Sequence, residues 1–417
     1  MLPCVRALKL VHLSILGNEN MSLENPSTSH ASQFDLEQRR AKSVESIQIL
    51  VLQPTGFCNI NCSYCYLPER DAKTRMSFNV VQRVADQILA SDYVNKDTLV
   101  LWHAGEPCAV PISWYSKVYA ILQASAKHKL RYQFQSNGTL ITDEWVKFLR
   151  ETGSTITLSI DGPAMLHDAH RLDRKGKGTF ERVLDGAKRL KAGGVKFSCI
   201  AVVTQASLSH AEEIFNFFHE LDPISVGFST EEAEGANATS SVYQVEALAG
   251  IRRFFDKLTE LNLASSSPLR IRELEQVLLP LTNDPRVIVQ NQECALAAMV
   301  TIAADGTIAF FSPEHLTTIR EDGSRLVSGN LLTSSFSEIV NASATVTMET
   351  EISKGVENCR RDCSYFRFCG GGAPSNKYWE HGRFDGTETW HCRVTKQAVT
   401  DGILSAISKV GGGRAPT

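Results

Sequence analysis

From Ser46 onward the chain alternates between short apolar runs and stretches with helical periodicity. The apolar runs predict strands at 47–53, 98–103, 130–135, 155–160, 196–203 and 224–228. The helical stretches that follow them are 77–91, 112–127, 143–151, 179–192, 210–221 and 241–263. Strands that alternate with helices form parallel sheets with right-handed crossovers. The pattern therefore predicts an α/β fold, either a doubly wound sheet or an incomplete barrel.

Three cysteines stand close together directly after the first predicted strand. Cys58, Cys62 and Cys65 have the spacing C-x3-C-x2-C. A cubane iron–sulfur cluster normally takes four cysteine thiolates, so three of them leave one iron open to a small molecule. Half of a zinc knuckle or a redox pair is the alternative for the last two cysteines, but zinc needs a fourth ligand. The loop therefore predicts a [4Fe–4S] cluster with an open iron.

The second half of the chain carries another group of cysteines. Its members are Cys359, Cys363, Cys369 and Cys392. Four thiolates can complete the ligand set of a second cluster, and a structural zinc ion is the alternative. Upstream of them, the segment 299–311 predicts a β-hairpin that turns at Asp305 and Gly306.

Composition excludes several classes of partner. The chain has 417 residues and a formal net charge of -3, so no basic field suggests binding to nucleic acid or to a membrane surface. No apolar run approaches the roughly 20 residues of a membrane span. Its 11 cysteines are concentrated at two places, which favours metal ligation in a reducing cytoplasm over a disulfide framework. Residues 1–45 are expected to be a disordered tail, with Met1 or Met21 as the start.

The first cysteine loop, PTGFCNINCSYCYLPER, resembles the cluster-binding loop of radical S-adenosylmethionine (SAM) enzymes. Behind it, in the same order as in that family, come HAGEP at 103–107, QSNGTL at 135–140, SIDGP at 159–163 and HDAHR at 167–171. The resemblance implies a partial (β/α)6 barrel in which SAM binds the open iron and yields a 5′-deoxyadenosyl radical. The SAM contacts that it implies are Tyr64, His103, Gly105, Glu106, Ser136, Asn137, Ser159, Arg171 and Val203. Ala104 replaces the first glycine of the family's G-G-E-P pattern.

The second half resembles the SPASM extension of peptide-modifying radical SAM enzymes, whose full pattern has seven cysteines for two auxiliary clusters. Cys294 and Gly306 match its opening, but Phe311 and Ala373 stand where two further cysteines are expected. The resemblance therefore implies that only the second auxiliary [4Fe–4S] cluster is kept, on the four cysteines from Cys359 to Cys392. Ser312 stands where sulfatase-maturing members carry a catalytic aspartate, which argues against that activity.

The segments SPEH at 312–315, CGGGAPSNKY at 369–378 and TETWHC at 387–392 look like those of cyclophane-forming maturases of glycine-rich repeat peptides. This resemblance implies a ribosomal precursor peptide as substrate and a carbon–carbon bond between an aromatic ring and a side-chain β-carbon. It also implies an electron donor such as flavodoxin or ferredoxin. A thioether, an epimer or another oxidation product is the alternative, and a radical SAM RNA modifier or a non-catalytic scaffold is a rival class.

Two carboxylates are candidate bases for this reaction, Glu314 and Glu234. Glu234 lies in the acidic loop STEEAEGAN, for which a solvated loop is the plainer interpretation. The expected domains are the radical SAM barrel at 46–265, a linker with a short helix at 266–293 and the SPASM-like domain at 294–417.

Overall fold

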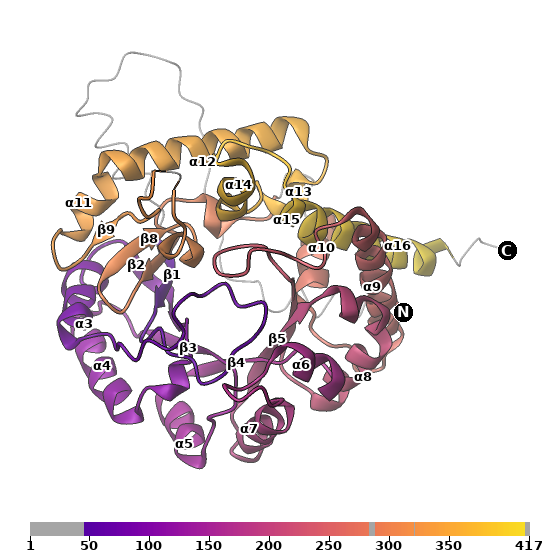
Figure 1. Ribbon diagram of the computed structural model, residues 1–417, viewed down its shortest axis with the longest axis horizontal. Coiled ribbons are helices and arrows are strands. Elements are labelled where there is room, and N and C mark those ends of the chain that lie inside the picture. The colour runs from indigo at the N-terminus through magenta and orange to yellow at the C-terminus, as the bar shows by residue number, and fades with distance from the viewer. Residues whose placement is uncertain (1–45, 283–287, 321, 413–417) are drawn as a thin grey trace.

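The computed structural model describes residues 46–282, 288–320 and 322–412 (Figure 1). The expectations of a disordered tail over residues 1–45 and of a start at Met1 or Met21 lie outside the described residues.

Six parallel strands stand side by side in the order in which the chain makes them. They are β1 (Ile47–Leu52), β2 (Val94–Trp102), β3 (Arg131–Ser136), β4 (Thr155–Ser159), β5 (Phe197–Val203) and β6 (Val226–Thr230). A doubly wound sheet would reverse its strand order at an internal switch point. Here each strand pairs with its predecessor throughout, as Leu52 does with Trp102 and Trp102 with Phe134. This order confirms the partial barrel.

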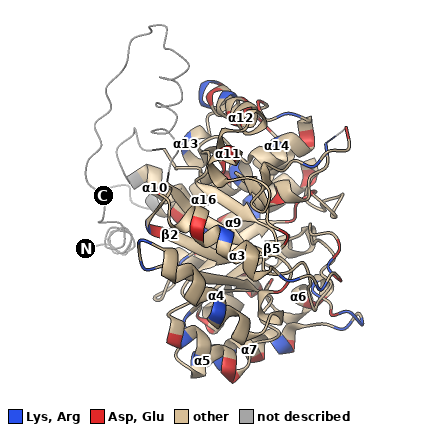
Figure 2. Ribbon diagram, turned by 90° about the vertical axis from the view of Figure 1, so that its left-hand side faces the viewer, with Lys and Arg blue, Asp and Glu red and all other residues tan. Residues whose placement is uncertain are grey.

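Helices cover the outer face of the sheet and form a ring around it (Figure 1). They are α3 (Phe78–Val84), α4 (Ile112–Ser125), α5 (Asp143–Thr152), α6 (Ala164–His170), α7 (Phe180–Ala192) and α8 (Ala211–Leu221). Local sequence fixes their ends: the Thr142 side chain accepts a hydrogen bond from the Trp145 N–H at the start of α5, and Gly153 ends that helix at φ 65°. Charged residues are distributed along the helices of this ring (Figure 2).

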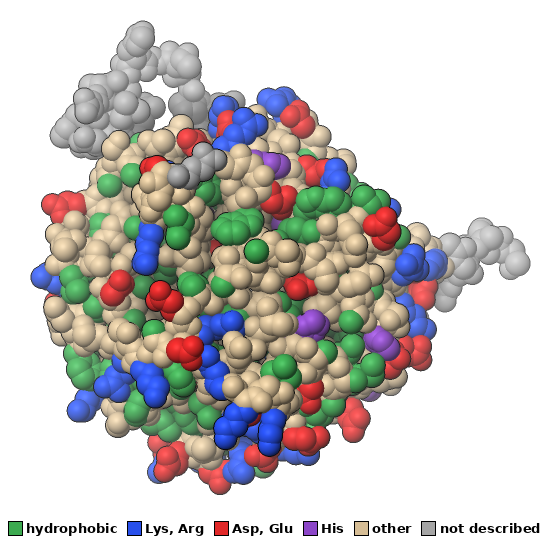
Figure 3. Space-filling view, viewed as in Figure 1, with side chains coloured by type: hydrophobic (Ala, Val, Ile, Leu, Met, Phe, Trp, Pro, Cys, Tyr) green, Lys and Arg blue, Asp and Glu red, His purple; other side chains and the backbone are tan. Residues whose placement is uncertain are grey.

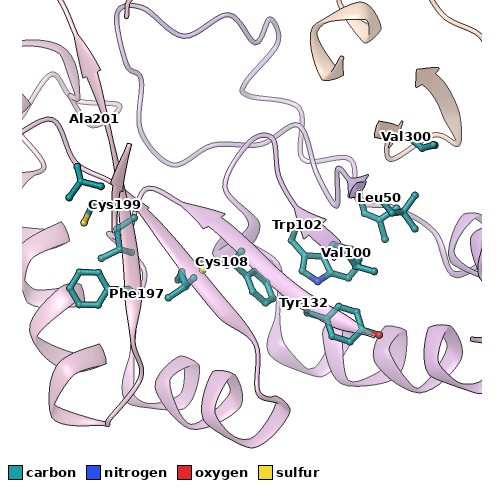
Figure 4. Packing of buried hydrophobic residues seen from close by; sticks show 14 of the residues in the cluster. Leu50, Val100, Trp102, Cys108, Tyr132, Phe197, Cys199, Ala201 and Val300 are labelled. Atoms are coloured by element: carbon teal, nitrogen blue, oxygen red, sulfur yellow. The ribbon is translucent and has the colours of Figure 1, made fainter. Parts of the chain in front are cut away.

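The main core lies between the sheet and this ring, where bulky side chains of neighbouring strands point to the same side (Figure 4). Trp102 of β2 and Phe134 of β3 each meet the Tyr115 ring of α4 edge to face, with ring centroids 5.1 Å apart. On the opposite face of the strands, Gln135 donates to Ser159 Oγ at 3.0 Å. Partly buried polar side chains such as these stand on the inner face beside apolar ones, so the barrel interior offers hydrogen-bonding groups to a ligand.

The second half of the chain extends the same sheet. After α9 (Val245–Ala264) and α10 (Arg272–Thr282), strand β7 (Met299–Ile302) pairs in parallel with β1. Strands β8 (Thr307–Phe310) and β9 (Gly329–Asn330) then continue it antiparallel. The remaining helices are α11 (Phe336–Asn341), α12 (Ser343–Asp362), α13 (Phe366–Cys369), α14 (Pro374–His381), α15 (Trp390–Cys392) and α16 (Ala398–Gly412).

Several local predictions can be compared with these elements. The hairpin at 299–311 is confirmed, with Gly306 at φ 86° in its turn, and so is a helix within 266–293. Strand β2 begins at Val94, earlier than predicted, because Val94 pairs with Ile47 across the sheet. The sequence pattern gave no expectation of the 20-residue helix α12. In the described part of the chain, no helix is long and apolar enough to cross a membrane.

Candidate active site

The loop between β1 and α3 crosses the open centre of the helical ring on the carboxyl side of the strands (Figure 1). It holds Cys58 and Cys62, which are 9% and 8% exposed, and the partly exposed Cys65. Burial raises the pKa of Cys58 to about 12, and the charges of Glu106, Cys62 and Cys65 contribute to that increase. Cys58 and Cys62 belong to one buried cluster, and Cys65 packs against it. The structure therefore gathers the first predicted cysteine set in one place.

Buried N–H groups surround the sulfur atoms of this loop. The Asn137 Nδ2 atom lies 3.7 Å from Cys58 Sγ, and Arg171 Nη1 lies 3.9 Å from Cys62 Sγ. The backbone is held as well, because Arg174 donates to the Cys58 carbonyl at 2.7 Å and Arg70 to the Cys62 carbonyl at 2.8 Å. Hydrogen bonds to cysteine sulfurs are typical of iron–sulfur sites. The donors around this loop fit such a cluster.

Arg171 is held by a carboxylate that the sequence analysis did not single out. Its Nε and Nη2 atoms each lie 3.0 Å from an oxygen of Asp161, whose carboxylate also accepts hydrogen bonds from the Val202 N–H and from the Tyr64 hydroxyl. Burial opposes ionisation of Asp161, but the charge of Arg171 prevails and lowers its pKa. Within SIDGP the dipeptide Asp161–Gly162 is an ordinary turn signal, so only the fold reveals this pairing. The predicted contacts of Arg171 and Tyr64 with SAM stay predictions.

The turn after β2 packs tightly against the cysteine loop. Gly105 has φ 55°, and a Cβ atom there would lie 2.4 Å from the Phe57 carbonyl oxygen, so only glycine fits. Ala104, which replaces the family glycine, also has a positive φ of 68°. The carboxylate of Glu106 is buried and accepts hydrogen bonds from the Cys108 N–H, the Ser136 hydroxyl and the Asn137 N–H at 2.7–2.8 Å. It thereby fixes the loop that follows β3.

The other predicted SAM contacts are placed along the same edge of the sheet. Burial lowers the pKa of His103 to about 4, so its ring is neutral at physiological pH. Ser159 ends β4 with its hydroxyl bonded to Gln135. Val203 is 1% exposed and belongs to the core, whereas Val202 beside it is partly exposed on the inner face. Contact of Val203 with adenine stays a prediction.

A group of carboxylates lies beside the cysteine loop at the mouth of the barrel. The loop after β6 rests on the first cysteine loop, since the Ala236 N–H donates to the Tyr66 carbonyl at 2.8 Å. Glu234, in this loop, is 2% exposed, so it is not a solvated acidic residue. Burial raises its pKa well above the ordinary value of 4.5, and the charges of Glu314, Glu232 and Glu293 raise it further. The two predicted bases, Glu234 and Glu314, are thus brought together.

Further polar groups neighbour these carboxylates. Burial raises the pKa of Glu293 to about 7, with further contributions from Glu314 and Glu232. Ser312 donates a hydrogen bond to Glu314. Among the described residues, the Tyr66 hydroxyl and Glu234 Oε1 are buried atoms without a hydrogen-bond partner. Unpartnered buried polar atoms are costly in a folded protein, so a group that pairs with these two would stabilise this region.

The second cysteine set comes together below α12. Burial raises the pKa of Cys392 to about 12, and the charges of Cys369, Cys363 and Cys359 contribute, so all four thiols are neighbours. Two N–H donors again face the sulfurs: Lys377 Nζ lies 3.4 Å from Cys359 Sγ, and Gln397 Nε2 lies 3.7 Å from Cys392 Sγ. This donor set also fits an iron–sulfur cluster.

The chain reaches this arrangement through three consecutive glycines. Gly370, Gly371 and Gly372 have φ values of 65°, 120° and 77°, which side chains other than glycine rarely adopt. The Asn291 side chain then donates to the Gly372 carbonyl at 2.6 Å. A cavity of about 200 Å³ opens beside the set, and its wall includes Cys369, Gly372, Glu293, His391 and Lys396.

The two cysteine sets are connected by the carboxylate group. On one side, Tyr66 follows Cys65. Burial raises the pKa of its hydroxyl, and the charges of Glu314, Glu234 and Glu232 contribute to that increase. On the other side, His391 precedes Cys392, and its Nδ1 atom lies 3.5 Å from Glu232 Oε2. Burial lowers the pKa of His391 to about 3, so it is a neutral neighbour of the acid.

The positions of the missing SPASM cysteines are occupied differently. Phe311 is fully buried in the core at φ 69°. Cys294 keeps its thiol, which donates to the Gly372 carbonyl at 3.3 Å. In the described part of the chain, no three His, Cys, Asp or Glu side chains converge as ligands of one metal ion. The thiolates of a cubane bind separate irons and do not need to converge in that way.

Comparison with known proteins places these features in a family. The radical SAM superfamily profile matches residues 52–218. The uncharacterized protein sll1766 of Synechocystis sp. is 34% identical over 367 residues, which are 87% of this chain and 92% of that protein. A cysteine-type anaerobic sulfatase-maturating enzyme of Clostridium novyi is 24% identical over 358 residues, which are 80% of this chain and 89% of that enzyme.

Solved structures share the fold. The structure of native anSMEcpe with bound AdoMet matches this one with a TM-score of 0.69 at 21% sequence identity. The matched region is 87% of this chain and 98% of the anSMEcpe chain. The structure of Streptococcus suis SuiB bound to precursor peptide SuiA matches with a TM-score of 0.62 at 18% sequence identity. The matched region is 93% of this chain and 87% of the SuiB chain. The matched segment 52–218 includes the first cysteine loop and the strand ends that surround it. The chain belongs to the radical SAM superfamily, whose enzymes use SAM and a [4Fe–4S] cluster, and it is related to enzymes that modify peptides and proteins.

Proposed function

We propose that this protein modifies a ribosomally made precursor peptide by joining a side-chain β-carbon to an aromatic ring, which produces a cyclophane. In this proposal the first cysteine set holds the SAM-binding cluster. Cys359, Cys363, Cys369 and Cys392 hold one auxiliary [4Fe–4S] cluster. A thioether, an epimer or another oxidation product is the alternative outcome of the same chemistry.

Peptide substrates are supported by the related proteins. SuiB was solved with a precursor peptide, and anSMEcpe was also solved with AdoMet and a peptide named Cp18Cys. The curated relatives include sulfatase-maturating enzymes, which act on a protein. A peptide chain is therefore the substrate class that we carry over to this protein.

The observation that carries the proposal is the group of buried carboxylates between the two cysteine sets. Joining two carbons that each lose a hydrogen releases one hydrogen atom and then one proton together with one electron. SAM and the first cluster supply abstraction of the hydrogen atom, and the auxiliary cluster supplies an electron acceptor. Glu234 and Glu314 would accept the proton, because burial raises the pKa of both carboxyl groups above the ordinary value and makes their carboxylates stronger bases.

The chain's own residues have positioning roles in this scheme. Asp161 orients Arg171 against Cys62, and Glu106 orients Asn137 against Cys58. These buried contacts would hold the first cluster loop in one geometry and exclude water from it. A rigid site matters here because the C–H bond held closest to the abstracting group decides which product forms.

Sulfatase maturation is disfavoured by the residue that precedes Glu314 by two positions. Ser312 is 2% exposed and donates its hydroxyl hydrogen bond to Glu314. A serine cannot replace the aspartate expected there as a base at neutral pH. Glu314 is then the carboxylate beside Ser312 that could act as a base.

The proposed reaction requires an electron donor and a reducing compartment. SAM must be reduced by one electron per turnover, so an electron donor such as flavodoxin or ferredoxin is required. The protein is proposed to act in the cytoplasm, where free thiols and iron–sulfur clusters are kept.

Co-expression with a glycine-rich precursor peptide that carries aromatic residues tests the proposal. Mass spectrometry should find a peptide that lacks two hydrogen atoms per modification and that resists thiol-directed reagents, because the new bond joins two carbons. Cys58→Ala should give unmodified peptide, whereas Cys199→Ala, which changes a buried cysteine outside both sets, should keep the modification. A modified peptide of unchanged mass would contradict the crosslink and indicate epimerisation. A loss of two hydrogens that requires a cysteine in the substrate would indicate a thioether.

A further inference from the structure

A buried lysine lies against the second cysteine set. Lys377 belongs to α14 and is 3% exposed. Among the described residues, no carboxylate lies within ion-pair distance of its Nζ atom. Lysine is almost never buried in this way unless a negative group compensates its charge.

The contacts of Lys377 identify what that negative group is. Its Nζ atom donates to Cys359 Sγ at 3.4 Å and to the Gly355 carbonyl at 3.3 Å. A thiolate at Cys359 is therefore the partner that this ammonium is placed to stabilise.

Small residues make room for this contact. A Cβ atom at Gly355 would lie 3.2 Å from Lys377 Nζ and 2.4 Å from the Phe384 carbonyl oxygen. A Cβ atom at Gly372 would lie 3.7 Å from Lys377 Cε. The lysine side chain thus runs between α12 and the glycine loop, and a side chain at position 355 would crowd its ammonium group.

The first cysteine set is different in its charge balance. Arg171 approaches Cys62, but Asp161 binds two of its nitrogens at 3.0 Å and neutralises it. Gln397, the second donor at the C-terminal set, is neutral. Only the C-terminal set therefore has, within the described residues, a buried cation facing a cysteine sulfur without a carboxylate of its own.

Charge decides how such a cation acts on a redox site. A [4Fe–4S] cluster with four thiolates is negatively charged, and reduction by one electron adds one more negative charge. A nearby fixed positive charge stabilises the reduced form more than the oxidised form, most strongly in a buried site. The effect is a higher reduction potential and a better electron acceptor.

We propose that Lys377 is the residue that raises the reduction potential of the auxiliary cluster, so that this cluster takes the electron released when the substrate bond forms. The inference rests on the auxiliary cluster of the proposed function. Lys377 acts through Cys359 as a tuning residue and does not contact the substrate.

The test measures the auxiliary cluster alone. In full-length protein carrying Cys58→Ala, Cys62→Ala and Cys65→Ala, iron content and the midpoint potential are determined anaerobically by redox titration with electron paramagnetic resonance. Lys377→Met removes the charge and keeps the length of the side chain, and Lys377→Arg keeps the charge. Lys354→Met is the matched control, because this exposed lysine lies on α12, the helix that carries Cys359, and pairs with Asp385.

We expect Lys377→Met to shift the redox equilibrium toward the oxidised form by at least tenfold, which is 59 mV for a one-electron couple. Lys377→Arg and Lys354→Met should stay within a few-fold of the parent protein. An unchanged potential in Lys377→Met with full iron would overturn the inference.

Loss of the cluster has its own interpretation. If Lys377→Met loses iron and Lys377→Arg keeps it at the parent potential, the charge is required and the inference stands. If both variants lose iron and Lys354→Met keeps it, Lys377 has only a packing role and the inference fails. A parent protein that holds zinc or no iron would instead contradict the auxiliary cluster of the proposed function.

Discussion

At the scale of single residues, the pair of Asp161 and Arg171 is the most consequential buried interaction of the site. The two side chains are 3% and 8% exposed, and the pair also anchors Tyr64 and the backbone of β5. Breaking a buried ion pair by removing one charge leaves the other charge uncompensated. Arg171 approaches the Cys62 sulfur, and Asp161, ten residues earlier in the chain, holds it there.

Asp161→Asn should therefore destabilise the protein by about 3–5 kcal/mol and abolish SAM cleavage. The double variant Asp161→Asn with Arg171→Gln should be destabilised by less than the sum of the single changes, because the uncompensated charge is gone. Chemical denaturation under anaerobic conditions measures these free energies, and production of 5′-deoxyadenosine measures cleavage. Additive free energies would contradict the coupling.

Glu293 makes the stability of the protein depend on pH. Its pKa of about 7 in the folded protein exceeds the ordinary 4.5, because burial and the charges of Glu314 and Glu232 disfavour ionisation. The folded state therefore binds the proton more tightly than the unfolded chain. Its stabilising contribution is complete below pH 4.5 and is lost as the pH rises through 7.

Replacing Glu293 with Gln should remove part of this loss. Between pH 5 and pH 8 the free energy of unfolding of the variant should fall by about 1–3 kcal/mol less than that of the parent protein. Denaturation curves at both pH values measure the difference. Parallel behaviour of the two proteins would mean that Glu293 is ionised in the folded state at low pH.

Residue-level prediction from the sequence succeeded where chemistry depends on spacing alone. The three cysteines of the first loop lie on one short segment, so their proximity follows from the chain itself. Lys377 and Asp161 could not be found in this way, because their partners come from other elements. The sequence suggests Glu234 and Glu314 as candidate bases without placing them together. Only the fold brings them into one group.

At the scale of elements, the packing of α16 on α9 fixes the end of the chain that follows Cys392. A Cβ atom at Gly402 would lie 2.4 Å from the Arg252 carbonyl oxygen, which is a backbone atom of α9. Farther along, Lys409 forms ion pairs with Asp256 and Glu260 of α9 at 2.6 Å and 2.8 Å. The close approach of the two helices requires glycine at position 402.

Gly402→Ala should force the two helices apart and destabilise the protein by about 1–3 kcal/mol, although alanine favours helices. Thermal unfolding measures the effect. Ser408→Ala, an exposed position of the same helix, is the control and should change the melting temperature little. A more stable Gly402→Ala variant would contradict the close helix contact.

Elements with strong local signals were predictable, and those that depend on tertiary packing were not. The strands and helices of the first half alternate in pattern, and the turn at Asp305 and Gly306 has a clear hairpin signal. Helix α12 carries Thr and Val residues with low helix propensity, and it buries only a narrow face that includes Met348 and Ile352. The choice between a barrel and a doubly wound sheet depends on strand order, which no local pattern determines.

At the scale of the whole molecule, both halves build one sheet and one site. Strand β7 pairs with β1, so the C-terminal cysteines are attached to the same framework as the first loop. The loops after β1 and β6 meet at the open face of the ring, where Lys and Arg side chains lie below the centre and hydrophobic side chains above it (Figure 3). This arrangement places the group of buried carboxylates between the two cysteine sets.

In the proposed function the two cysteine sets serve different steps, hydrogen abstraction and electron acceptance. The most direct test is the ratio of crosslinked peptide to 5′-deoxyadenosine, measured on the same anaerobic reactions for the parent protein, Cys58→Ala, Cys392→Ala and the control Cys199→Ala. The account predicts neither product for Cys58→Ala, the parent ratio for Cys199→Ala, and continued formation of 5′-deoxyadenosine with at least a tenfold lower ratio for a folded Cys392→Ala. A folded Cys392→Ala protein that lacks the auxiliary cluster and still gives the parent ratio would contradict the account.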